Sequence, residues 1–82
     1  MKVIPVEVPS LGACELREPS IAVMRKHMAL MESDIREFLI EVIGESLFKD
    51  GQKVPLDSVP FGALTPLTTT ITEMLGFGSG EG

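Results

Sequence analysis

A ladder of apolar residues runs along the middle of the chain, with gaps that alternate between three and four residues. Its members are Ile21, Met24, Met28, Met31, Ile35, Phe38 and Val42. This spacing places them on one stripe of an α-helix. Because Ser20 precedes the ladder as a candidate N-cap, the pattern predicts a helix over about residues 20–48.

This helical region has two interpretations, and the sequence leaves both open. It forms one long rod, or it breaks near Ser33, where Asp34 and Glu37 are well placed for the first turn of a second helix. Before Ser33 the apolar stripe is narrow, whereas after it apolar residues cover most of the helix circumference. We therefore expect the second half to form the centre of the core.

The predicted elements before and after this helical region are shorter. Strand-forming residues alternate with prolines over 3–9, Ser10–Gly12 is typical of a turn, and Ala13–Arg17 is a returning strand. We predict a β-hairpin over about residues 3–17, with Pro5 and Pro9 limiting the first strand to an edge or to a short piece. Two strands alone are marginally stable, so the hairpin must pack on a helix or pair with another chain.

Beyond the ladder, Gly44 weakens the helix and a polar turn at 49–52 ends it. The proline-rich segment 54–62 is apolar enough to lie against the core, and Asp57 or Ser58 is a candidate cap for a short turn.

A last helix is predicted over 65–75, with Thr65 as N-cap, Pro66 at its first position and a buried face of Leu67, Ile71, Met74 and Leu75. Residues 76–82 form a Gly-rich tail, which we expect to be flexible.

These elements predict one small domain over residues 1–75. Its fold class is α+β, mostly α, with an N-terminal β-hairpin followed by two to four helices. A chain of 82 residues buries a smaller share of its surface than a full-sized domain. We therefore expect it to self-associate or to bind a partner.

Composition narrows the function classes. The net charge of -5 repels phosphate backbones and anionic lipid, so we expect neither nucleic acid nor membrane as a partner. One cysteine, Cys14, is typical of a reducing compartment. The opening residues hold no apolar run of signal-peptide length, and no segment approaches a membrane span, so we expect a soluble intracellular protein.

The residues that could serve in catalysis or metal binding are better explained by structural roles. Asp34, Glu37, Glu41 and Glu45 recur at helical spacing, but they are typical of a solvated helix face, and the Glu-x-x-His pairs of helical metal sites do not occur. We interpret the single histidine, His27, as a boundary residue and Cys14 as a small apolar strand residue. The sequence therefore predicts no catalytic residue, no metal site and no cofactor, and we expect a protein that is not an enzyme.

Two short motifs resemble sites that bind or carry phosphate groups. The glycines 76, 78 and 80 follow a predicted helix and have no lysine nearby, so they are not typical of a phosphate loop. Asp57 and Ser58 precede an apolar residue, as in acyl carrier proteins, where the serine carries phosphopantetheine at the start of an acidic helix. Here Pro60 and Gly62 follow, and the acidic helix comes before the motif, so an acyl carrier is a remote alternative.

The segment Leu16-Arg17-Glu18-Pro19 leads from the hairpin into the helical region. Together with the apolar hairpin, the core helix, the polar turn and the small last helix, it resembles the tail assembly chaperones of long-tailed bacteriophages, including the Mu-like group. The resemblance covers residues 6–75 in organisation. It implies a chaperone in the bacterial host cytoplasm, of phage or prophage origin, that keeps the long helical tape measure protein soluble during tail assembly. In many members a frameshifted longer form also exists.

The residues themselves agree with such a role. Methionine is flexible and adapts to irregular apolar surfaces, so we predict that Ile21, Met24, Met28 and Met31 bind the partner. The alternative is that these residues belong to the protein's own core. A small homo-oligomeric interaction or regulatory module is the nearest alternative function.

Overall fold

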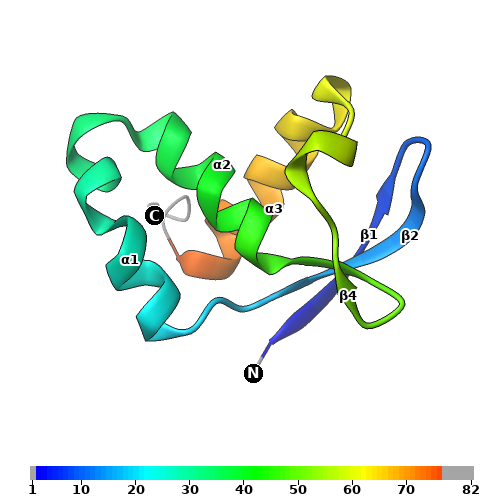
Figure 1. Cartoon of the computed structure of the whole chain (residues 1–82), viewed down its shortest axis with the longest axis horizontal. Coiled ribbons are helices and arrows are strands. Elements are labelled where there is room, and N and C mark those ends of the chain that lie inside the picture. The colour runs from blue at the N-terminus through cyan, green and yellow to red at the C-terminus, as the bar shows by residue number, and fades with distance from the viewer. Residues whose placement is uncertain (1, 77–82) are drawn as a thin grey trace.

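The computed structural model describes residues 2–76 of the chain (Figure 1). The regular elements, in chain order, are β1 (Val3–Val8), β2 (Gly12–Arg17), α1 (Ile21–Ser33), α2 (Ile35–Ser46), β3 (Leu47–Lys49), β4 (Gln52–Lys53) and α3 (Leu64–Leu75). Two 3₁₀ turns, η1 (Leu56–Ser58) and η2 (Phe61–Ala63), lie between β4 and α3. The predicted class is confirmed, because the described chain is α+β, mostly α, and opens with an antiparallel hairpin.

The hairpin forms as the strand-forming residues and the turn between them predict. β1 pairs with β2 in antiparallel register from Val3 opposite Arg17 to Val8 opposite Gly12. In the turn, Ser10 has φ 66° and Gly12 has φ 85°, and glycine adopts such left-handed values without strain. β1 is the edge strand of the sheet, which suits Pro5 because an edge strand tolerates a missing N–H.

The sheet has two further strands that the sequence did not predict. β3 follows α2 directly and pairs antiparallel with β2, Leu47 opposite Leu16 and Phe48 opposite Glu15, and β4 pairs with β3. The predicted helix end at residue 48 is therefore wrong. Leu47 leaves the helix because its fully buried side chain packs in the core beside the hairpin. The polar turn at 49–52 joins β3 to β4 instead of following a helix.

The helical region consists of two helices, so the interpretation with a break is the correct one. Asp34 separates them with extended φ and ψ of -157° and 89°. Its backbone N–H donates to the Leu30 carbonyl at 2.7 Å, and its side chain accepts the Glu37 N–H at 3.2 Å. One residue thus ends α1 and caps α2, and the two helices fold back on each other.

The core lies where α2 meets the hairpin and α3. The buried apolar residues are Val8, Cys14, Leu16, Phe38, Val42, Ile43, Leu47, Val54, Ala63, Leu67, Ile71 and Met74. The expectation that the second half of the ladder forms the core centre is confirmed by Phe38 and Val42, which are fully buried. Figure 1 shows α1 at one end of the molecule, the hairpin at the other and α2 between them.

The proline-rich segment packs closely on α2. Val54 is buried, and Leu56 and Val59 pack against the core, as predicted. A Cβ atom placed on Gly44 would lie 2.9 Å from Cγ and Cδ1 of Leu56, which is closer than side chains pack. Gly44, predicted only as a weak point of the helix, therefore makes room for Leu56.

The last helix starts earlier than predicted. α3 begins at Leu64, directly after η2, and Ala63 occupies the N-cap position with no side-chain hydrogen bond, so the assignment of Thr65 as N-cap is wrong. The helix needs no such cap because η2 turns the chain into it. Its predicted face is confirmed for Leu67, Ile71 and Met74, which are buried, whereas Leu75 is half-buried. Apart from Gly76, the predicted tail lies outside the described residues, and the single domain over 1–75 stays a prediction.

Candidate interaction surface

α1 carries the predicted partner-binding residues, and the structure divides them into two pairs. Ile21 and Met28 are exposed, with 77% and 48% of their surface accessible. Met24 and Met31 are half-buried and pack against the core. None of the thirteen residues of α1, all of them described, is fully buried. The helix therefore lies on the body of the protein without entering its core.

Helix geometry explains this division. Residues seven apart in an α-helix point in directions only about 20° apart, so Ile21 shares a direction with Met28, and Met24 shares one with Met31. The two pairs differ by about 60° around the axis. Met24 and Met31 lie on the side that faces the body, and Ile21 and Met28 lie at the margin of this side, beside solvent. The same apolar stripe therefore supplies both the residues that contact the body and those that are exposed beside it.

The start of α2 carries one more exposed apolar residue. Ile35 follows the break at Asp34, and 47% of its surface is accessible. Among residues 2–76, the large exposed apolar side chains are Val3, Ile21, Met28, Ile35 and Phe61. Three of them come from the ladder. These three exposed side chains, spread along α1 and the first turn of α2, are the candidate contacts for a binding partner.

A charged cluster joins α1 to the body. Glu45 of α2 accepts hydrogen bonds from Lys26 Nζ at 2.9 Å and Lys53 Nζ at 3.0 Å, and its Oε2 lies 3.2 Å from Nε2 of His27. The Glu45 and His27 side chains are largely covered, while both lysines are mostly exposed. Three separate elements, α1, α2 and β4, therefore meet at one carboxylate.

The Lys26 and Lys53 ammonium groups, with His27, lower the pKa of Glu45 from 4.5 to about 2. Glu45 is therefore ionised at neutral pH. An ionised carboxylate only accepts hydrogen bonds, so His27 must carry a proton on Nε2 to bond with it. The interpretation of Glu45 as part of a solvated face and of His27 as a boundary residue missed this pairing.

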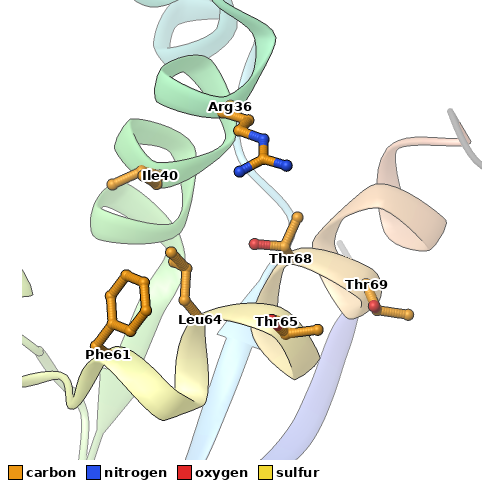
Figure 2. Close-up of a pocket in the computed structure, with 7 residues that line it drawn as sticks. All are labelled: Arg36, Ile40, Phe61, Leu64, Thr65, Thr68 and Thr69. Atoms are coloured by element: carbon orange, nitrogen blue, oxygen red, sulfur yellow. The ribbon is translucent and has the colours of Figure 1, made fainter.

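A second apolar feature lies between α2 and α3. A cleft of about 400 Å³ is lined by Arg36, Ile40, Phe61, Leu64, Thr65, Thr68 and Thr69. Phe61, on η2, is 88% exposed at its edge. Figure 2 shows the Arg36 side chain extending from α2 towards Thr68 on α3. Within residues 2–76, Arg36 forms no ion pair. The cleft thus combines an apolar wall with an unpaired cation.

The other candidate residues lie apart from one another. Cys14 is buried in β2, as expected for a small apolar strand residue, and Ser58 is exposed at the end of η1. In the described part of the chain, no group of His, Cys, Asp and Glu has a metal-binding arrangement, and no helix is long and apolar enough to span a membrane.

Comparisons with protein-family models, curated proteins and solved structures find no match to this chain. Function must therefore be inferred from the surface itself. Its most prominent feature is α1, which presents Ile21 and Met28 to solvent and buries no residue completely.

Proposed function

We propose that this protein is a tail assembly chaperone of a long-tailed phage or prophage, which binds the tape measure protein in the bacterial host cytoplasm and is not an enzyme. The observation that carries the proposal is the outer margin of α1. There, Ile21 and Met28 are exposed on a helix with no fully buried residue. A long amphipathic client helix needs such an apolar partner until it is assembled.

The energetics of this surface suit reversible binding. Each apolar side chain buried on binding contributes about 1.5–3 kcal/mol before the entropy of association is subtracted. Ile21, Met28 and Ile35 together therefore give modest affinity for one site on a client. Many copies along one client multiply that affinity, while each copy still dissociates readily. The chaperone would then be displaced stepwise during assembly.

Self-association is part of the proposal, and the cleft between α2 and α3 is the observation that favours it. Phe61 is an exposed aromatic beside an apolar wall, and aromatic residues are enriched in protein interfaces. A homo-oligomeric interaction module without a helical client is the second candidate function, and it would use the same cleft. The two candidates differ in whether a client is bound through α1.

The test is an affinity pull-down of the tagged protein from cells that express its neighbouring genes, followed by mass spectrometry. We expect recovery of a very long helical protein with the wild type and loss of that protein with the double variant Ile21→Glu, Met28→Glu. The matched control is Ala22→Glu with Ala29→Glu, which adds the same charge at the same spacing on exposed positions of α1. Met24 is left unchanged because it packs against the core.

The same experiment separates the alternatives. Recovery of the protein's own copies alone, with no long client, would contradict the chaperone and favour the homo-oligomeric module. Equal loss of the client in both double variants would show that charge on α1, and not its apolar margin, controls binding. An intact mass raised by phosphopantetheine, located on Ser58, would favour the acyl carrier instead.

A further inference from the structure

α1 is the helix least deeply packed into the structure. α2 places Phe38, Val42, Ile43 and Ser46 in the interior, and α3 places Leu67, Ile71 and Met74 there. α1 buries no residue completely and contacts the core through the half-buried Met24, Leu30 and Met31. Local opening is cheapest where least apolar surface is buried. α1 should therefore separate from the body before either of the other helices.

The joints at both ends of α1 permit such a movement. At its C-terminal end, Asp34 alone has extended backbone angles between two helices, so rotation there leaves the hydrogen bonds inside α1 and α2 intact. At its N-terminal end, residues 18–20 link it to β2 without regular structure. We call α1 the strap, because short segments outside the helices connect it to the body at both ends.

Glu45 opposes this movement. It holds Lys26 and His27 of α1 through one carboxylate oxygen, at 2.9 and 3.2 Å. Its other oxygen accepts a hydrogen bond from Lys53 of β4, which fixes the carboxylate to the body of the protein. Hydrogen bonds to a charged group are stronger than neutral ones, above all where the acceptor is largely shielded from water. The strap is therefore closed by these polar contacts together with the half-buried side chains of Met24, Leu30 and Met31.

We propose that Glu45 acts as a latch that holds α1 against α2, and that its release exposes the inner apolar face of α1 to the client helix. This inference rests on the proposed function for the identity of the client. Opening would add Met24, Leu30 and Met31 to the exposed Ile21 and Met28. The closed form would keep most of this apolar face covered when no client is present, which limits aggregation of the free chaperone.

The latch is tested by hydrogen exchange of the full chain, read by mass spectrometry in wild type and in Glu45→Gln. We expect amides of α1 to exchange about tenfold faster in the variant, while those of α2 and α3 keep their protection. Glu41→Gln is the matched control, because Glu41 lies one turn earlier on α2 and has no ion pair within the described residues. Unchanged exchange in α1, or equal acceleration in all three helices, would overturn the latch.

Coupling to binding is tested with a labelled, uncharged amphipathic peptide of about 20 residues, long enough to span the molecule as a helix. Because the closed form competes with binding, Glu45→Gln should bind this peptide severalfold more tightly than wild type. Equal affinity in the two proteins, combined with faster exchange in α1, would overturn the coupling. The pull-down decides the proposed function separately, since exchange in α1 does not depend on any client.

Discussion

α1 and α2 are neighbouring helices of similar length that share one apolar ladder, yet they use it differently. In α2 the ladder residues Phe38 and Val42 are fully buried between the sheet and α3, and only Ile35, at the first position of the helix, is exposed. In α1 the ladder residues are half-buried or exposed, and a charged cluster supplements the apolar contact. Helical spacing therefore identifies an apolar face, but the number of elements packed against the helix decides whether that face becomes core or surface.

The largest expected contrast comes from truncating one ladder residue in each helix. Phe38→Ala should lower the free energy of unfolding by about 3–5 kcal/mol, because it leaves a cavity in the core. Met28→Ala should change it by less than about 0.5 kcal/mol, because about half of the Met28 surface is already in water and the residue lies outside the buried core. Urea denaturation of both variants measures the difference. Similar losses in the two variants would show that α1 belongs to the core.

A second contrast lies in how closely each helix is approached by its neighbours. Gly44→Ala in α2 should destabilise the protein by about 1–2 kcal/mol, because the new methyl group would meet Leu56 at 2.9 Å. In a Leu56→Ala background the same substitution should become neutral or stabilising, since alanine favours helices over glycine. Thermal unfolding of the four proteins in this cycle provides the measurement. An identical effect in both backgrounds would contradict the close contact.

The break between the helices depends on the side chain of Asp34. Asp34→Ala removes the acceptor for the Glu37 N–H and should cost about 1 kcal/mol of unfolding free energy. Asp34→Asn keeps an acceptor oxygen in the same place and should retain most of the stability. Chemical denaturation compares the three proteins. If alanine and asparagine behaved alike, the cap would not determine where α2 begins.

The last contrast is a pH dependence of the charged cluster. Because Glu45 has a pKa of about 2 in the folded protein against 4.5 ordinarily, its ionised form stabilises the fold above pH 4.5. That contribution disappears as the pH falls from 4.5 towards 2. The stability difference between wild type and Glu45→Gln should therefore shrink as the pH falls through this interval. A difference that stayed constant down to pH 2 would contradict the pairing.

The same contrast explains what the sequence was able to predict. Local patterns sufficed for the hairpin, for the helical ladder and for Asp34 as a cap, because each depends on residues within a few positions. β3 was missed because Leu47 and Phe48 continue an apolar helix pattern, and their pairing with Leu16 and Glu15 is a long-range contact. Its three residues are also too few to show an alternation of their own.

The surface was predicted only in part, for a similar reason. The ladder identified Ile21, Met24, Met28 and Met31 as apolar positions on one helix, but only the packing on α2 separates the exposed pair from the half-buried pair. The partners of Glu45 are 19, 18 and 8 residues away along the chain, beyond the reach of helical spacing. Phe61 and Ile40 likewise meet at one cleft only after the chain folds.

The central claim is that the outer margin of α1 serves a client and not the protein's own stability. The most direct measurement is co-expression with a tape measure protein, the proposed client, comparing the soluble fraction of that client with wild type and with Ile21→Glu, Met28→Glu, while unfolding is measured on each purified variant. We predict that the double variant keeps the stability of wild type and leaves the client insoluble. A variant that unfolds, or one that keeps the client as soluble as wild type does, would contradict the claim.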